Sequence, residues 1–386
     1  MDSAPPGEQA RESPGAFRGG LDPRARPAVQ HIPRYVAGDS PERVRRSLGL
    51  LSPVKLASNE NPLGPSPLAV EALRTASTEV ARYPEDDAWP LRQALAARLD
   101  VPPEWVAVGA GSSALLKLLA EAYLAPGDGA VYAWPSFILY PVVARLQEAR
   151  EVAVPLDPEG RHDLDRMAQA AQQARLVVVC NPNNPTGTYV ARRDLERFLD
   201  QVPPEALVVL DEAYAEFARD AAGEDYPDGV AWVRDGRRVA VLRSFSKVYG
   251  LAGLRVGYLV AAPEVVEAVH RVREPFQVSS PAQAAALAAL QDQAHVERTL
   301  RVVAQGRRAL SQLAARWGLR AYPSVANFVW MDVGRPAEAV AQALLRLGVI
   351  VRPGPRGATW IRVSVGTPEE VARFAEALEA VLKDTG

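Results

Sequence analysis

Short apolar runs alternate with helical patterns through the middle of the chain, and this alternation restricts the possible fold most. The runs are rich in β-branched residues and apolar on both faces, so the strands they form should be buried between helices. The sequence therefore predicts an α/β fold, a three-layer, doubly wound and mostly parallel sheet, with ligands at the carboxyl ends of its strands. The expected strands are 105–108, 129–133, 151–154, 175–180, 206–210, 239–242 and 256–260, and the helical patterns lie near 112–124, 136–148, 163–173, 191–200 and 262–273.

The composition of the chain changes on both sides of this region. Residues 1–28 are rich in Pro, Gly, Ala and Arg without periodicity, which predicts a disordered tail, and 29–58 should form an N-terminal arm. Within 55–67, Pro, Asn and Gly are so frequent that only loop structure is expected. We expect a large domain over 59–280 and a smaller α+β domain over 281–386, with strands near 326–332, 349–352 and 360–364.

Composition excludes several classes of function. Of the 386 residues, 48% are hydrophobic and 23% charged, and the net charge of −2 favours neither nucleic acid nor an anionic membrane as partner. The single cysteine, Cys180, excludes an internal disulfide, and the four histidines lack ligand spacing, so no metal site is expected. No apolar run approaches the roughly 18 residues of a membrane span, and no signal-peptide core is visible, so the expected compartment is the cytoplasm.

The stretch 242–258 joins two expected strands and concentrates reactive side chains. It contains Ser244, Ser246, Lys247 and Arg255, and its three glycines exclude a helix. A desolvated lysine has a lowered pKa and forms Schiff bases with carbonyl groups, while the hydroxyls and the guanidinium could hold a phosphate. Pyridoxal phosphate (PLP) requires both of these features from its protein. A solvated basic surface loop would explain the same residues.

A glycine turn follows the first expected strand. Residues 109–114 read Gly-Ala-Gly-Ser-Ser-Ala, which formally matches a dinucleotide-binding pattern. However, the next strand ends in Trp134-Pro135 and offers no acidic residue for a ribose. We therefore expect the amides of Ser112 and Ser113, at a helix N-terminus, to hold a single phosphate, with a plain tight turn as the alternative.

Other candidate site residues follow the next strands. The loop 181–187 holds three asparagines, and Asn184 can donate to a ring oxygen. Asp211 ends a strand and could pair with a protonated ring nitrogen, although an Asp that caps a helix is the competing interpretation. Glu212 should point the opposite way by strand alternation. Among the aromatic residues after 129–133, Phe137 is the first candidate to stack on a planar ring.

Two arginines lie on otherwise apolar strands near the C-terminus. Arg352 and Arg362 would be buried there, and a buried guanidinium needs an anionic partner. Its planar fork suits a carboxylate or a phosphate. A substrate anion and a structural salt bridge both remain open as that partner.

Together these motifs resemble the fold-type I PLP enzymes of the aspartate aminotransferase superfamily, and most closely the histidinol-phosphate aminotransferases. The matching pieces follow the order of the family from about residue 31 to the end of the chain. They are Ala57-Ser-Asn-Glu-Asn-Pro62, Arg82-Tyr-Pro84, Asn181-Pro-Asn-Asn-Pro-Thr-Gly187, Asp211-Glu-Ala-Tyr214, Ser244-Phe-Ser-Lys-Val-Tyr-Gly-Leu-Ala-Gly-Leu-Arg255 and Arg362-Val-Ser-Val-Gly-Thr367.

The resemblance implies a role for each candidate residue. Lys247 would bind the cofactor as a Schiff base and move the proton at the substrate's α-carbon, with Asp211 on the ring nitrogen and Asn184 and Tyr214 on the ring oxygen. The phosphate would be held by Ser112, Ser113, Ser244, Ser246 and Arg255, and by Tyr83 of a neighbouring subunit, which implies a homodimer with shared sites. Tyr35, Arg352 and Arg362 would bind the anion of the substrate.

The resemblance also implies a reaction. It would convert L-histidinol phosphate and 2-oxoglutarate, an amino donor and a 2-oxo acid, to imidazole-acetol phosphate and glutamate. An aromatic amino-acid aminotransferase and a threonine-phosphate decarboxylase are the alternatives on the same scaffold. Three departures leave the substrate open, because Phe137 stands where Tyr is common, Ser113-Ala114 where an acidic pair is frequent, and Gln277 where Asn is frequent.

Overall fold

The computed structural model describes residues 21–32, 34, 38–355 and 357–384, and it contains two sheets. A seven-stranded sheet has the order β2-β8-β7-β6-β5-β3-β4, and only β8 runs antiparallel to its neighbours. The predicted α/β fold with a doubly wound, mostly parallel sheet is confirmed. Its strands are β2 (Val106–Gly109), β3 (Gly129–Trp134), β4 (Arg150–Pro155), β5 (Ala174–Cys180), β6 (Leu207–Asp211), β7 (Val239–Ser244) and β8 (Gly257–Val260).

Helices cover both faces of this sheet because its strands are apolar on both faces. In β5, Leu176 and Val178 pack toward one face, and Val177 and Val179 belong to the core of the other. The first face is covered by α5 (Ser112–Tyr123), α6 (Leu139–Leu146) and α11 (Pro263–Val272). The helices α4 (Trp89–Leu99), α7 (Leu164–Ala171), α8 (Arg192–Gln201), α9 (Ala215–Ala222) and α10 (Gly229–Arg234) contribute to the second core.

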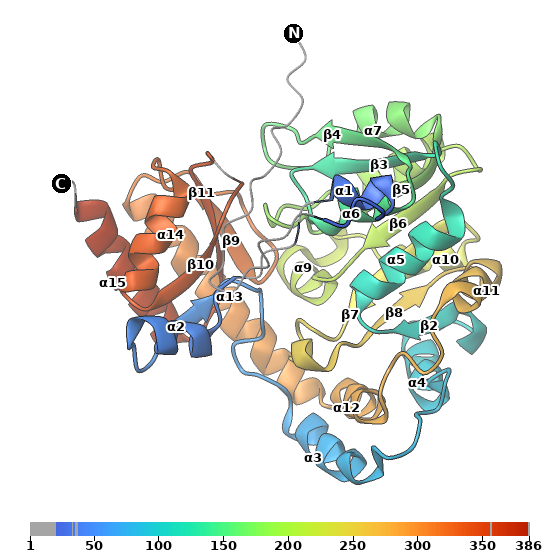
Figure 1. Cartoon of the computed structure of the whole chain (residues 1–386), viewed down its shortest axis with the longest axis horizontal. Coiled ribbons are helices and arrows are strands. Elements are labelled where there is room, and N and C mark those ends of the chain that lie inside the picture. The colour runs from blue at the N-terminus through green and yellow to red at the C-terminus, as the bar shows by residue number, and fades with distance from the viewer. Residues whose placement is uncertain (1–20, 33, 35–37, 356, 385–386) are drawn as a thin grey trace.

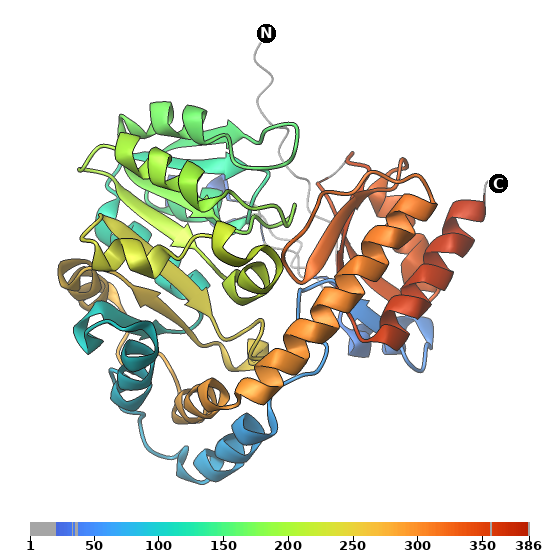
Figure 2. The ribbon, with the colours of Figure 1, turned by 180° about the vertical axis from the view of Figure 1, so that it is seen from behind.

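A four-stranded sheet of order β1-β10-β11-β9 lies beside the large one, with the long helix α13 running between them (Figures 1 and 2). The edge strand β1 corrects the expectation that 55–67 is loop throughout, because Lys55 and Leu56 pair in parallel with Ile350 and Val351. The pairing partners of β1 are almost 300 residues away, so the local sequence does not indicate a strand here. The elements are β1 (Val54–Leu56), β9 (Phe328–Asp332), β10 (Val349–Pro353), β11 (Trp360–Ser364), α2 (Pro41–Leu48), α13 (Gln293–Arg316), α14 (Ala337–Arg346) and α15 (Pro368–Lys383).

Two segments lie differently from their sequence assignments. Much of the predicted tail 1–28 lies outside the described residues, but its end enters α1 (Pro27–Gln30), and Arg26 donates to the carbonyl of Leu146 at 2.9 Å. Helix α12 (Ser280–Gln291), nearly all of it assigned to the small domain, packs on α3 (Pro67–Ala76) and α4. The domain boundaries stay a prediction. Short 3-10 helices are η1 (Ser77–Glu79), η2 (Pro103–Trp105), η3 (Gly223–Asp225) and η4 (Ala252–Leu254).

The described part of the chain has no helix that is both long and apolar enough to span a bilayer. Nor do its His, Cys, Asp and Glu residues gather in groups of three or more that could hold a metal ion.

A buried ion pair joins β7 to the residue that follows β6. Two nitrogens of Arg243 donate to Glu212 Oε2 at 2.9 and 2.7 Å, and both side chains are nearly inaccessible, at 3% and 2% exposure. The other oxygen of Glu212 accepts from the amide of Gly229 at 2.9 Å, which ties the start of α10 to the same pair. Glu212 thus points away from Asp211, as strand alternation predicts, and it has a structural role.

We predict that Glu212→Gln destabilises the protein by about 3–5 kcal/mol, because it leaves the Arg243 charge buried without its main partner. Urea unfolding measures this difference. The matched control is Glu267→Gln in the exposed pair with Arg271, which should cost less than about 1 kcal/mol. Equal losses in the two variants would contradict the structural role of Glu212.

Candidate active site

Lys247 lies in the turn after β7, close to residues that follow β1 of the small sheet and β6 of the large sheet. Its Nζ donates to the carbonyl of Ser58 at 3.3 Å and lies 5.5 Å from the centre of the Tyr214 ring. The pKa of Lys247 is lowered to about 8. Burial is the main cause, and the nearby positive charge of Arg362 is the second. A larger fraction of this amine is therefore neutral near neutral pH than in an ordinary lysine, while its role as a nucleophile stays a prediction.

Asp211 ends β6 and is almost completely buried. Its carboxylate accepts a hydrogen bond from the hydroxyl of Tyr140 at 2.9 Å and one from the amide of Ala213 at 3.3 Å. Burial raises its pKa, against the effect of these two hydrogen bonds. A buried carboxyl of this kind is suited to a cationic ring nitrogen, and it does not cap a helix: Tyr214 is the residue before α9.

Two contacts connect the loops of the large sheet to the small sheet. The hydroxyl of Tyr214 accepts from Asn59 Nδ2 at 3.0 Å, and burial raises the pKa of this hydroxyl to about 12. Arg362 Nη1 donates to Asn184 Oδ1 at 2.5 Å, and its Nη2 donates to the carbonyl of Ala57 at 2.8 Å. A group held by Asn184 and a group held by Arg362 would therefore lie next to each other.

A cradle of hydroxyl, guanidinium and backbone amide groups lies at the start of α5. Ser246 donates its amide to Ser244 Oγ at 3.0 Å, and Arg255 Nη1 donates to Ser246 Oγ at 3.3 Å. A Cβ on Gly111, whose φ is +90°, would lie only 2.6 Å from the Arg255 guanidinium. The backbone can approach so closely only as glycine. Ser112 and Ser113 follow Gly111 directly, and their amides are the first of α5, at the helix N-terminus.

The other predicted residues make contacts outside this group. Phe137 packs edge-on against Tyr140, with the ring centres 5.8 Å apart. Tyr83 is 82% exposed and stacks on Phe276 at 4.7 Å, so it serves no site within its own chain in this structure. Arg352, on β10, lies opposite Arg362, on β11, in the antiparallel strand register. The prediction for Tyr35 lies outside the described residues.

Sequence analysis missed three residues of this region. Tyr140 contacts Asp211, while Phe137 was ranked above it as the important aromatic residue. Asn59 and Ser364 form a reciprocal pair, in which Ser364 Oγ accepts the amide of Asn59 and donates to Asn59 Oδ1. Asn59 belongs to the motif 57–62, so the sequence did point to this loop. Ser364 gave no such indication, because its partner is 305 residues away in the sequence.

Comparison with known proteins agrees with this geometry. The family model for aminotransferase class I and II matches residues 52–378. The chain belongs to this aminotransferase family. The resemblance inferred from the six motifs is thereby confirmed.

Curated relatives span nearly the whole chain. The histidinol-phosphate aminotransferase of Moorella thermoacetica is 47% identical, with 93% of each chain covered. That of Symbiobacterium thermophilum is 49% identical, covering 92% of this chain and 98% of its own.

Solved structures give the same result for the fold. The histidinol-phosphate aminotransferase of Sinorhizobium meliloti, in complex with pyridoxal-5'-phosphate, has a TM-score of 0.85 at 31% identity, with 97% of this chain and 100% of that chain covered. The aspartate aminotransferase double mutant of Thermus thermophilus has a TM-score of 0.77 at 26% identity, with 92% and 98% covered. The residues of this aminotransferase fit a cofactor such as PLP, because the cradle at Gly111, the buried Asp211 and the low pKa of Lys247 match its phosphate, ring nitrogen and aldehyde.

We predict that capture of PLP by the cofactor-free enzyme accelerates as the pH rises through about 8. The neutral amine of Lys247 reacts, and its pKa is about 8 instead of the ordinary 10.5. Stopped-flow absorbance across pH 6.5–10 measures the midpoint. Arg362→Gln should move this midpoint upward, since it removes one positive charge, and a wild-type midpoint near 10.5 would refute the desolvation of Lys247.

Proposed function

We propose that this chain is a PLP-dependent histidinol-phosphate aminotransferase of histidine biosynthesis. It would convert L-histidinol phosphate and 2-oxoglutarate to imidazole-acetol phosphate and glutamate. The observation that carries the proposal is identity of 44–49% to curated histidinol-phosphate aminotransferases over nearly the whole chain. The site supports it, because a low-pKa lysine lies near a buried carboxyl and an arginine that can bind an anion.

The cofactor, when bound, supplies a carbonyl carbon for the amino group and a ring that withdraws electrons from the substrate's α-carbon. Lys247 would hold this carbonyl carbon and afterwards carry the proton at the α-carbon. Asp211, oriented by Tyr140, would hold the proton on the ring nitrogen. Asn184 and Tyr214 would donate to the ring oxygen, and Phe137 would cover one face of the ring.

The remaining residues would bind anions. Ser112, Ser113, Ser244, Ser246 and Arg255 form the proposed cradle for the cofactor phosphate. Arg352 and Arg362 would bind the phosphate of histidinol phosphate in one half of the reaction and a carboxylate of 2-oxoglutarate in the other. A guanidinium fork can donate to either anion. Tyr35 would complete this clamp.

We also propose a cytoplasmic homodimer with shared sites. Tyr83 and Phe276 form a stacked aromatic pair with exposures of 82% and 41%, and Arg273 fixes the adjacent loop through Asp86. Exposed aromatic pairs of this kind are favourable contacts for a partner. Tyr83 of one protomer would then reach the phosphate cradle of the other.

The substrate assignment is tested with purified enzyme and PLP. Histidinol phosphate should bleach the cofactor's visible band, 2-oxoglutarate should restore it, and Lys247→Ala should show neither change. Keto-product formation is compared for histidinol phosphate and phenylalanine, and carbon dioxide release is measured with threonine phosphate. Preference for phenylalanine would reassign the enzyme to aromatic transamination, and decarboxylation would make it a lyase.

The shared site is tested by mixing two impaired variants, Lys247→Ala and Tyr83→Ala. If Tyr83 acts across the dimer, one site of each mixed dimer contains both residues, so unfolding and refolding the two together should restore activity above either variant alone. Steady-state rates over the mixing ratio measure this. No recovery, despite dimers seen by analytical ultracentrifugation, would place Tyr83 outside the partner's site.

A further inference from the structure

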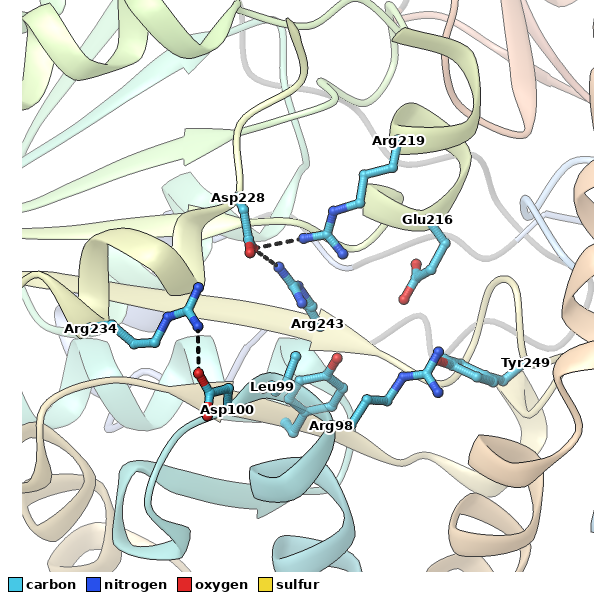
Figure 3. Close-up of a pocket in the computed structure, with 10 residues that line it drawn as sticks. Arg98, Leu99, Asp100, Glu216, Arg219, Asp228, Arg234, Arg243 and Tyr249 are labelled. Atoms are coloured by element: carbon cyan, nitrogen blue, oxygen red, sulfur yellow. Dashed lines mark hydrogen bonds and ion pairs between the residues drawn. The ribbon is translucent and has the colours of Figure 1, made fainter. Parts of the chain in front are cut away.

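A second cavity lies away from Lys247 (Figure 3). It has a volume of about 270 Å³ and lies among the end of α4, the helices α9 and α10, and the strand β7. Arg243 projects into it, whereas the next residue, Ser244, takes part in the anion cradle. The cavity is therefore separate from the candidate active site.

Most charges in this cavity neutralise one another. Asp228 accepts from both Arg219 and Arg243 at 2.8 Å, and Arg234 pairs with Asp100 at 3.1 Å. Figure 3 shows these pairs as dashed lines. Three arginines are thus occupied by acids of the protein.

Two charged side chains of the cavity, the half-buried Glu216 and the exposed Arg98, form no ion pair with a described residue, although Arg243 and Arg219 attract the Glu216 carboxyl at longer range. Glu216 has no hydrogen bond or ion pair from its carboxylate to any residue that the structure describes, and burial raises its pKa. Among the described residues, Arg98 donates only to the neutral amide oxygen of Gln293, at 2.9 Å. Both side chains project into the cavity (Figure 3). One carboxyl and one guanidinium group thus face the same space.

We propose that this cavity binds a small zwitterion, a free α-amino acid. Its ammonium group would pair with Glu216 and its carboxylate with Arg98, while its side chain would lie against Tyr249 and Tyr258. A phosphate or another simple anion would leave the carboxyl of Glu216 without a hydrogen-bond partner, whereas a zwitterion supplies a donor to it. The volume lies just below the roughly 300–1,000 Å³ of drug-sized ligand sites, which suits a single amino acid.

The position of the cavity connects it to the lysine loop. Arg243 precedes Ser244 directly, and Tyr249 lies two residues after Lys247. A ligand against Tyr249 would therefore touch the segment that carries the reactive amine, next to Arg243 at its other end. This inference concerns binding alone and does not depend on which substrate the active site prefers.

The test is equilibrium dialysis of labelled L-histidine, L-phenylalanine, L-leucine and L-glutamate against holoenzyme whose cofactor has been fixed to Lys247 with borohydride. At least one amino acid should bind at one site per chain. Glu216→Gln and Arg98→Gln should each weaken this binding about tenfold or more, since each removes a charge-assisted hydrogen bond. Melting temperatures confirm that the variants are folded.

Two controls separate this site from the active site. Glu224→Gln changes an exposed glutamate just beyond α9 and should leave binding unchanged, as should Arg362→Gln in the substrate clamp. Binding that survives Glu216→Gln but is lost in Arg362→Gln would assign the ligand to the active site and overturn the proposal. So would the absence of binding by all four amino acids.

Discussion

Parallel pairing of β5, β6 and β7 is the constraint on which the site depends. Asp211 lies in register with Cys180 on one side and Leu242 on the other, so the segments that follow these strands leave the sheet at the same edge. The asparagine loop, the buried carboxyl and the lysine turn are thereby adjacent, although more than sixty residues separate Asn184 from Lys247. This register is what brings the three segments together.

Alternation along the same strands sends the side chains of Asp211 and Glu212 to opposite faces of the sheet. Asp211 reaches Tyr140 on the α6 face, whereas Glu212 reaches Arg243 and Gly229 on the α10 face. A buried ion pair adds little net stability over an apolar contact, but breaking it is costly, so it resists displacement of the strand ends. The carboxyl of Asp211 is thus supported by charges that lie on the opposite side of the sheet.

Patterns that act within one element could be predicted from the sequence, and contacts between distant segments could not. The strands could be predicted, and so could the positions of Asp211, Asn184 and Lys247 at or after strand ends, because apolar runs mark buried strands and polar residues cluster where they end. The strand β1 was missed, because three residues gain their pairing only from β10. Tyr140 was passed over for the same reason: a tyrosine among apolar residues looks like core until the distant carboxyl beside it is known.

The small sheet contributes electrostatics as well as shape. Arg362, on β11, is one cause of the lowered pKa of Lys247, and it reaches the loops of the large sheet through Asn184. In the proposed reaction a substrate anion would rest on Arg362 and offset its positive charge. The pKa of a free Lys247 amine would then rise, which makes it a stronger base while the substrate is bound. Anion recognition and proton removal would therefore be coupled through one guanidinium, because both sheets present their side chains to the same space.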